Sequence, residues 1–561
     1  MSRPEAQDVL AILEPALAAL PAPQGAALRI RARQAHACFP GHVCSPPCHD
    51  EPVLLLLQLA MHLDAPRGLS VLWLVFAARL PSKDQLDNLR WQLPRNAPFA
   101  LAELIGDIED LAVATAVDEL RVLPPGTLLV DVTQTLRDPW YLTGIQRVVR
   151  GFLSSALGRD DLQLVHVDEE GRLVAVEAAA YLQRLDQGAS RREGTPADLR
   201  QRLVSRGIAL LLFARRPLLE RLKADRQFAT HPVVKAGRRA IRRLYREELR
   251  LPSASSRSLV VADGCTLLLI EVHMEASGVE TLLKVTQQQG TRLAVVFYDA
   301  IPLSHPHYYQ EVLLAGYLRY TRLLAAADVV LAISETSGSA ARALRDLHPE
   351  RSGRNHVQVV PLATGGLSVT SPGEVAGTVT TPLLLCVSSL EPRKNHVRLL
   401  RAATLVHRRG VEFHLILVAG SSWLSERIDR ELTAAREAGL DVQVRRSIND
   451  EQLSALYTRA RAAVFVSEVE GFGLPVAEAL SHGTPVVCSD TGSIAEVAAA
   501  GGCLSVSAHD ELAIADALER VLSDDVLHQR LTDEALLRPI RSWDDYADEL
   551  LSGIQDRFRT A

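Results

Sequence analysis

The chain has 561 residues, of which 47% are hydrophobic and 23% charged, enough apolar surface for roughly two or three cores. Its formal net charge is -6 and it contains no nucleic-acid-binding motif, so nucleic acid is excluded as a general partner. The N-terminus lacks the pattern of a secretory signal, and the longest apolar runs, Val53–Ala60 and Val71–Ala78, are too short to span a bilayer. We therefore expect a multidomain cytoplasmic protein.

Residues 1–122 are predicted to form a mostly helical accessory module. Helical patterns cover Asp8–Leu20, Ser82–Leu93 and Leu101–Leu120. One short loop of the module collects side chains of the types that bind zinc: His36, Cys38, His42, Cys44, Cys48 and His49. The cysteine spacing matches no standard zinc pattern, so free thiols are the favoured interpretation and a metal site is the alternative. The remaining cysteines are expected to be reduced thiols: Cys265, Cys386, Cys488 and Cys503.

From about residue 127 onward, strand patterns alternate with helical patterns, which predicts an α/β fold with parallel sheets. The first set of strands is expected at Thr127–Thr133, Leu267–Val272, Leu293–Tyr298, Val329–Ser334 and Val357–Leu362. The second set is expected at Leu383–Ser388, Phe413–Val418, Val442–Arg446, Ala463–Ser467 and Val486–Ser489. The sequence therefore predicts two α/β domains, residues 123–372 and 373–540, joined through a polar linker at Thr364–Thr381, and a C-terminal helix in 541–561.

Residues 200–250 form a basic insertion in the first α/β domain. Arginine and lysine outnumber the acidic residues there, and interleaved leucines favour amphipathic helices. Such helices can lie on anionic lipid, so peripheral contact with the inner face of the cytoplasmic membrane is one hypothesis. A solvated helical insertion is the other.

The segment Glu470–Glu478 places two carboxylates around a glycine turn after a predicted strand. Gly471 and Gly473 lead into a helical pattern, and backbone amides at a helix start can hold an anion. Glu478 lies about a turn inside that helix, where it can reach a hydroxylated group beside the anion. The alternative is that Glu470 caps the helix and Glu478 is an ordinary exposed residue.

A second motif, Ser388–Asn395, presents Arg393 and Lys394 in the turn after another predicted strand. An arginine can bind phosphate oxygens with two hydrogen bonds and a lysine adds a point charge, which suits a diphosphate leaving group. A solvated Arg-Lys pair is common in loops. Together with Glu470 and Glu478, however, the pair predicts neighbouring sites for a sugar and a phosphate.

The first domain contributes a loop at Arg137–Gly144 before a predicted helix that starts at Ile145. Gly144 would allow a close approach of the backbone and Arg147 would supply charge, whereas a structural turn capped by Thr143 is the alternative.

The segment Tyr298–Pro306 follows a predicted strand and should open onto the same cleft. It offers Asp299 and His305 as polar groups. For His305, a loop residue hydrogen-bonded to the backbone is the favoured interpretation.

The second half of the chain resembles the retaining glycosyltransferases of family four, which have the GT-B architecture of two facing Rossmann-like domains. Glu470 and Glu478 match that family's Glu-x7-Glu motif, Ser388–Asn395 its donor-diphosphate loop, and Ser334–Ser337 the end of its N-terminal domain. Thr143–Arg147 is similar to the version found in a subgroup that builds bacterial surface polysaccharides such as O-antigen and capsule. The resemblance also implies that the C-terminal helix returns onto the first domain.

The resemblance implies roles for individual residues. Arg393 and Lys394 would bind the donor diphosphate, Glu478 the nucleotide ribose, and Glu470 the transferred sugar. Further donor contacts are expected from Thr143, Gly144, Arg147, Ser389, Ile448, Gly471, Phe472, Gly473 and Leu474. Two departures stand out: Tyr298 replaces a histidine that related enzymes commonly have, leaving Asp299 near the reaction centre, and Arg446 replaces a glycine beside the nucleotide base.

By resemblance, the expected activity is a retaining, metal-independent hexosyl transfer that requires no cofactor. A hexose, with mannose favoured, would move from a nucleotide-diphosphate sugar to a growing bacterial surface polysaccharide or a polyprenyl-linked glycan. A GDP-sugar is the favoured donor and a UDP-sugar the alternative. Two other functions remain open: a nucleotide-sugar epimerase or glycogen-type synthase of the same fold, and a non-catalytic scaffold of a glycan assembly complex.

Overall fold

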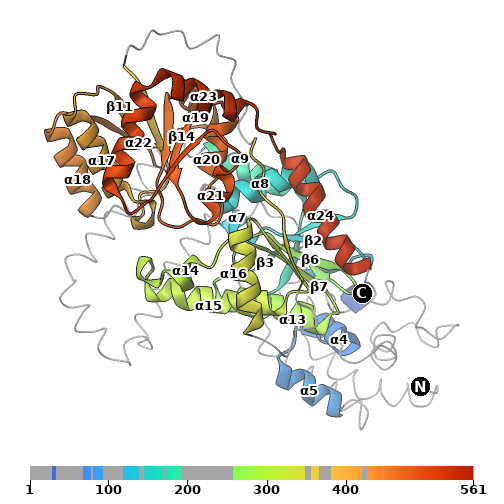
Figure 1. Ribbon diagram of the computed structural model, residues 1–561. Helices are drawn as coiled ribbons and strands as arrows, with labels where there is room; N and C mark the ends of the chain where they lie inside the picture. The colour runs from blue at the N-terminus through green and yellow to red at the C-terminus, as the bar shows by residue number, and fades with distance from the viewer. Residues whose placement is uncertain are drawn as a thin grey trace, which may run out of the picture.

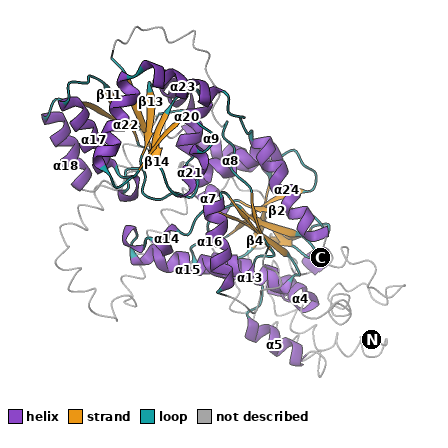
Figure 2. Cartoon of the chain, in the orientation of Figure 1, coloured by secondary structure: helices purple, strands orange, loops and turns teal. Residues whose placement is uncertain are grey.

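The computed structural model describes residues 67–77, 80–92, 118–137, 144–168, 171–190, 257–347, 356–365, 381–419, 426–446 and 448–559, together with Leu28, Ile30, Arg31, Ala32 and Gln34. Two α/β lobes each have a sheet with helices on both faces (Figures 1 and 2). Several predicted features lie outside the described residues: the helix Asp8–Leu20, the loop His36–His49, Thr143, the basic insertion 200–250 and most of the linker Thr364–Thr381.

The first domain is built on a mixed sheet with the order β1-β5-β4-β3-β2-β6-β7-β8-β9 among the described residues. Its strands are β1 (Asp118–Val122), β2 (Leu128–Asp131), β3 (Leu162–Val167), β4 (Leu173–Val176), β5 (Arg257–Val261), β6 (Thr266–Leu269), β7 (Arg292–Phe297), β8 (Val329–Ala332) and β9 (Val357–Val359). The five predicted strands are confirmed as β2 and β6 to β9. β4 runs antiparallel to both its neighbours, which the expectation of a purely parallel sheet missed.

Two local predictions in this domain are wrong. Of the helix expected at Leu101–Leu120, residues 101–117 lie outside the described residues, whereas residues 118–120 belong to β1 and pair with β5. The strand expected at Thr127–Thr133 ends at Asp131, since Thr133 already begins a short helix. The Glu271 carboxylate stabilises that helix by accepting hydrogen bonds from the amides of residues 134 and 135 at 2.5 and 2.7 Å.

The helices of the first domain are α7 (Thr133–Arg137), α8 (Gly144–Ala156), α9 (Ala178–Ser190), α13 (Ala276–Gln288), α14 (Ile301–Ser304), η5 (Pro306–Tyr308), α15 (Glu311–Ala326) and α16 (Glu335–Asp346). From the N-terminal module, the structure describes α4 (Arg67–Ala77) and α5 (Lys83–Gln92). The second of these confirms the helix expected at Ser82–Leu93. Ser70 donates a hydrogen bond to Gln288, and the Gln288 amide donates to the Pro81 carbonyl, so this part of the module packs on α13.

The second domain has an all-parallel sheet in the order β12-β11-β10-β13-β14-β15. The strands are β10 (Leu383–Val387), β11 (His414–Val418), β12 (Asp441–Arg445), β13 (Ala462–Phe465), β14 (Val486–Ser489) and β15 (Cys503–Val506). The five predicted strands are confirmed. The half-exposed edge strand β15 was missed because its four residues carry no buried-strand pattern. Cys265, Cys386, Cys488 and Cys503 form no disulfide, as expected.

The helices of the second domain are η8 (Pro392–Lys394), α17 (His396–Arg408), α18 (Glu426–Glu437), α19 (Asp450–Arg459), α20 (Leu474–Ser481), α21 (Gly492–Ala498), α22 (Glu511–Ser523), α23 (Asp525–Leu536) and α24 (Trp543–Arg559). None of the helices in the described ranges is long and apolar enough to cross a membrane.

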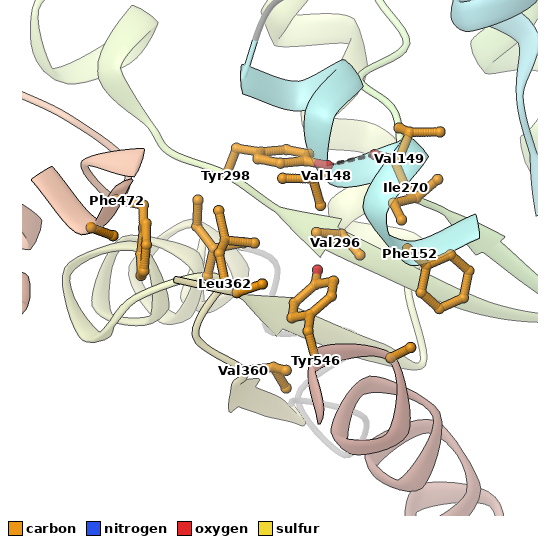
Figure 3. Close-up of a cluster of buried hydrophobic side chains, with 14 of the residues drawn as sticks. Val148, Val149, Phe152, Ile270, Val296, Tyr298, Val360, Leu362, Phe472 and Tyr546 are labelled. Carbon is orange, nitrogen blue, oxygen red and sulfur yellow. Dashed lines mark hydrogen bonds between the residues drawn. The ribbon is translucent and has the colours of Figure 1, made fainter. Parts of the chain in front are cut away.

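The C-terminal helix α24 returns onto the first domain and lies beside α8, as expected (Figure 1). The Trp543 ring occupies the space over Gly151, where a Cβ atom would lie 2.1 Å from the ring. One apolar cluster joins the two domains: it includes Tyr298 and Tyr546 on the side of the first sheet and Phe472 from the second domain (Figure 3). The domains are therefore held together by buried apolar contact as well as by the chain.

His396, the first residue of α17, is buried, and its Nε2 lies 2.9 Å from the Ser388 hydroxyl. Burial, helped by the charge of Lys394, lowers the pKa of His396 from 6.5 to about 4. Between these two values the unfolded chain takes up a proton that the folded chain does not. Acidification through this range therefore destabilises the fold.

We predict that Gly151→Ala lowers the free energy of unfolding by about 1–3 kcal/mol, because the added methyl group would overlap the Trp543 ring. Gly158→Ala is the matched control, since no atom lies within 4 Å of a Cβ at that position. Urea unfolding followed by circular dichroism measures both. A Gly151→Ala variant as stable as the wild type would contradict the packing of α24 on α8.

We also predict that lowering the pH from about 7.5 to about 5 reduces the free energy of unfolding more in the wild type than in His396→Gln. The difference between the two losses is expected to be about 1–3 kcal/mol. The variant loses the packing of the imidazole, but it has no group that titrates there. Urea midpoints at the two pH values give the comparison. Parallel losses in the two proteins would show that His396 does not carry this pH dependence.

Candidate active site

A cavity of about 250 Å³ lies between the two domains, at the carboxyl end of β7. The first domain supplies an aromatic wall, and the second supplies the turn at residues 391–393. Its lining residues include Tyr298, Asp299, Tyr309, Tyr317, Glu391 and Arg393. The predicted cleft between the domains therefore contains two of the predicted site residues, Asp299 and Arg393.

The structure brings Glu470 together with both predicted cations. Arg393 donates to one carboxylate oxygen of Glu470 at 2.8 Å, and the Lys394 ammonium donates to the other. The two loops are also joined by their backbones, because the Glu468 amide donates to the Arg393 carbonyl at 2.8 Å. Glu470 does not cap α20, so the alternative role considered for it is wrong.

The charges of this cluster are stabilised by one another. Burial would raise the pKa of Glu470, but the charges of Lys394 and Arg393 outweigh burial and lower that pKa to about 2. Burial lowers the pKa of Lys394, an effect that Glu470 opposes. Burial also acts to lower the pKa of Arg393, but Glu470 and Glu391 raise it above its usual value. Glu470 is therefore an anion held between two buried cations at neutral pH.

The turn that carries the two cations depends on Asn395. Its φ of 62° makes it the one non-glycine residue with a left-handed backbone in the part of the chain that the structure describes. Asparagine tolerates this conformation better than most residues. Its side-chain nitrogen Nδ2 donates to the carbonyls of Val466 and Ala508, at 3.0 and 2.7 Å. These anchors hold Arg393 and Lys394 toward Glu470, a function that the sequence did not indicate.

The glycine turn, residues Glu470–Leu474, presents free backbone amides. No described residue accepts a hydrogen bond from the amides of residues 471–474. Gly473 has a φ of 110° and precedes α20, so the turn needs glycine there. Gly471 is required by space, because a Cβ atom would lie 2.6 Å from the Tyr298 carbonyl oxygen. The turn therefore offers several hydrogen-bond donors at a helix start, beside Glu470.

Glu478 is buried, with 5% of its surface exposed, so its interpretation as an ordinary exposed helix residue is wrong. Tyr457 donates to one of its oxygens at 3.1 Å, and Arg147 of α8 forms an ion pair with the other. Arg147 also lies 3.5 Å from Asp450. Burial would lower the pKa of Arg147, but Glu478 and Asp450 raise it. This ion pair links the two domains across the cleft.

Among the other residues predicted to contact the donor, Gly144 and Ile448 make apolar contacts between the domains, whereas Ser389 is hydrogen-bonded near Arg393. Gly144 begins α8 next to Leu474, whose Cδ1 would be 3.7 Å from a Cβ at that position, and Ile448 packs against the shared apolar cluster. Ser389 donates to Glu391 at 2.6 Å, and Glu391 in turn accepts from Arg393 at 3.0 Å. Ser389 therefore does not contact the guanidinium of Arg393 in these hydrogen bonds, but holds the Glu391 carboxylate that does.

In the segment after β7, Asp299 faces the cavity with its carboxylate, whereas Tyr298 and His305 make structural hydrogen bonds. Asp299 lines the cavity and accepts a hydrogen bond from the Ile301 amide at 2.9 Å, and burial raises its pKa. The Tyr298 hydroxyl donates to the Ile270 carbonyl at 2.7 Å inside the core, so this side chain is structural (Figure 3). His305 does not line the cavity. Its Nδ1 lies 2.8 Å from the Ser304 hydroxyl, and its amide donates to the Ile301 carbonyl.

The first domain also contains a buried polar cluster that the sequence did not predict, formed by Asp131, Glu271 and His273. His273 Nε2 lies 2.6 Å from Asp131, and burial together with the charge of Asp131 raises the pKa of Glu271 to about 7. The residue types would suit a metal, but the carboxylates already accept hydrogen bonds from Thr133, from α7 amides and from His273. The sequence placed all three near strand ends, since Asp131 is the last residue of β2 and Glu271 and His273 follow β6 within four residues.

Comparison with known proteins identifies part of the chain. Residues 374–538, less than half of the chain, match the family model for glycosyl transferases group 1. Two curated relatives from Escherichia coli are each 32% identical. Serotype-specific mannosyltransferase WbdA aligns over 124 residues, 22% of this chain and 15% of the relative. O-antigen chain mannosyltransferase B aligns over 170 residues, 30% of this chain and 44% of the relative.

The chain thus spans less than half the length of either relative. Among solved structures, sucrose-phosphate synthase from Thermosynechococcus elongatus matches with a TM-score of 0.50 and 18% identity, over 78% of this chain and 100% of that one. At this level of identity the likeness shows the fold. The chain therefore carries a glycosyl transferases group 1 domain, on the two-domain fold of GT-B glycosyltransferases.

Proposed function

We propose that the protein is a retaining glycosyltransferase that moves a hexose, with mannose favoured, from a nucleotide-diphosphate sugar to a growing surface polysaccharide or lipid-linked glycan. The observation that carries the proposal is the cluster of Arg393 and Lys394 with Glu470, next to the free amides of the glycine turn. Arg393 lines the cavity between the domains, and Gly471 of the turn lies next to Asp299, which lines the same cavity. A GDP-sugar is the favoured donor.

The two cations are the proposed diphosphate site. When the bond between sugar and phosphate breaks, negative charge grows on the departing diphosphate, and a preorganised positive charge lowers the energy of that state. Arg393 and Lys394 are held in place by Glu470, Glu391 and the Asn395 turn, so they need little rearrangement. Because they supply the neutralising charge, we propose that transfer needs no metal ion.

The transferred sugar is proposed to lie against the glycine turn. Its hydroxyl groups can donate to the Glu470 carboxylate and accept from the amides of residues 471–474. Asp299 faces the same cavity from the first domain, where its carboxylate can bind a hydroxyl of the sugar or of the acceptor. We assign no covalent nucleophile, because retention is proposed to occur by attack on the face that the diphosphate leaves.

The ribose is proposed to bind Glu478. Arg147 holds that carboxylate in the present structure, so the ribose hydroxyls would replace the guanidinium. Arg147, at the N-terminal part of α8, would then be free to contact the diphosphate. Replacing the guanidinium by ribose hydroxyls keeps the Glu478 carboxylate hydrogen-bonded, and a buried carboxylate without a partner would have a high free energy.

The acceptor is proposed to enter through the aromatic wall of the cavity. The relatives named above are mannosyltransferases, one of them for an O-antigen chain, which supports a glycan acceptor. A polyprenyl-linked acceptor would bring the enzyme to the inner face of the cytoplasmic membrane. The basic insertion at residues 200–250 is the segment predicted to contact anionic lipid there.

The proposal predicts that Arg393→Ala and Lys394→Ala each lower kcat by about 100-fold or more, because each removes a charge that stabilises the leaving diphosphate. Release of nucleoside diphosphate is measured with GDP-, UDP-, dTDP- and ADP-sugars, with acceptor glycan and with EDTA present. Arg409→Ala is the matched control, since this arginine pairs with Asp516 and Glu519 on the surface of the same domain.

One donor class should be cleaved by the wild type and the control, with the sugar appearing on the acceptor in the original anomeric configuration. Near-normal turnover in either Arg393→Ala or Lys394→Ala would remove the diphosphate role. A sugar altered without any acceptor would favour an epimerase. If no donor is cleaved or bound, the scaffold function would take precedence.

A further inference from the structure

Two serines of the first domain contact the glycine turn of the second. Ser334 is the N-cap of α16, and Ser337 lies in its first turn; both are buried, with 2% of their surfaces exposed. The Ser334 hydroxyl lies 2.8 Å from the Gly471 carbonyl oxygen, and the Ser337 hydroxyl lies 3.1 Å from the same atom. Ser337 also lies 2.5 Å from the Tyr298 carbonyl oxygen. None of these contacts involves a charged group.

Each hydroxyl has one proton, so the two serines cannot donate in all three of these contacts at once. The shortest distances assign the Ser337 proton to the Tyr298 carbonyl and the Ser334 proton to the Gly471 carbonyl. Ser334 in turn accepts from the Ser337 amide at 3.0 Å, which is the capping bond of α16. Ser334 is therefore fixed by its own helix while it donates across the domain interface.

The Gly471 carbonyl and the Phe472 amide belong to one planar peptide group, in which the C=O and N–H bonds point in opposite directions. A donor that holds the carbonyl therefore also sets the direction of the amide. Ser493 does the same for the preceding peptide, because its hydroxyl donates to the Glu470 carbonyl at 2.9 Å. Two consecutive amides of the turn, those of Gly471 and Phe472, therefore have their directions fixed by serine hydroxyls that donate to the carbonyl of the same peptide group.

We propose that Ser334 is a positioning residue for sugar transfer: by holding the Gly471 carbonyl it aims the Phe472 amide at the transferred sugar. The inference deepens the proposed function and rests on the assignment of the glycine turn to the sugar. It also connects catalysis to domain closure. Ser493 belongs to the same domain as the turn, whereas Ser334 reaches it only when the two domains meet.

A neighbouring contact provides a control that distinguishes the positioning of the Gly471 carbonyl from docking of the two domains in general. Glu496 of α21 accepts hydrogen bonds from the amides of Glu335 and Thr336, at 2.8 and 2.7 Å. It joins the second domain to the same first turn of α16, but it does not contact the glycine turn. Glu496→Ala therefore weakens the interface at this helix and leaves the Gly471 carbonyl untouched.

The test uses the full-length wild type, Ser334→Ala, Ser334→Thr and Glu496→Ala. Amide hydrogen exchange is measured by mass spectrometry on peptides that cover residues 468–476, without ligand. Transfer kinetics and the Kd for the nucleoside diphosphate are measured in parallel. Ser334→Thr keeps both the hydroxyl and the helix cap, so it is the rescue variant.

Ser334→Ala is expected to raise exchange in this segment and to lower kcat about 10-fold or more, with the Kd for the nucleoside diphosphate changed less than about twofold. Ser334→Thr should restore both values, and Glu496→Ala should keep most of the wild-type kcat and exchange. Unchanged exchange in Ser334→Ala would overturn the proposal, and so would equal losses in Glu496→Ala. If the wild type transfers no sugar, the proposed function fails, while the exchange data still decide whether Ser334 holds the turn.

Discussion

The contact between Glu470 and its two cations is the interaction on which the rest of the site depends. A buried carboxylate with no partner would be protonated or displaced, and buried cations without an anion would be equally unstable. With Arg393 on one oxygen and Lys394 on the other, all three charges are kept inside the protein. The same contact ties the turn before α17 to the turn before α20, so the groups proposed to bind phosphate and sugar are set at a fixed separation.

The first domain completes this arrangement from the other side. Arg147 pairs with Glu478, Ser334 holds the Gly471 carbonyl, and Tyr308 hydrogen-bonds to Glu468. The shared apolar cluster and the returning helix α24 hold the domains close enough for these contacts (Figure 3). The first two contacts end on residues of the proposed donor site, and Glu468 is joined to Arg393 through its backbone amide. Domain docking therefore sets part of the geometry of that site.

Sequence patterns predicted most of the second domain, because its strands are buried on both faces and its two motifs sit at strand ends. They failed where tertiary contact decides the local structure. The edge strand β1 is stabilised by its hydrogen bonds to β5. The helix after β2 is stabilised by the Glu271 carboxylate, which accepts a hydrogen bond from the Thr135 amide. In the site, residue types and spacing indicated Arg393 and Glu470, but no local pattern could show that Glu478 pairs with Arg147 or that Ser334 reaches Gly471.

The most direct test of the proposed donor site is a crystal structure of the protein with a nucleoside diphosphate bound. We expect phosphate oxygens at Arg393 and Lys394, ribose hydroxyls on Glu478, and Arg147 displaced from that carboxylate. A nucleotide bound elsewhere, or bound in the cleft while Arg147 still pairs with Glu478, would contradict the assignment of the donor site.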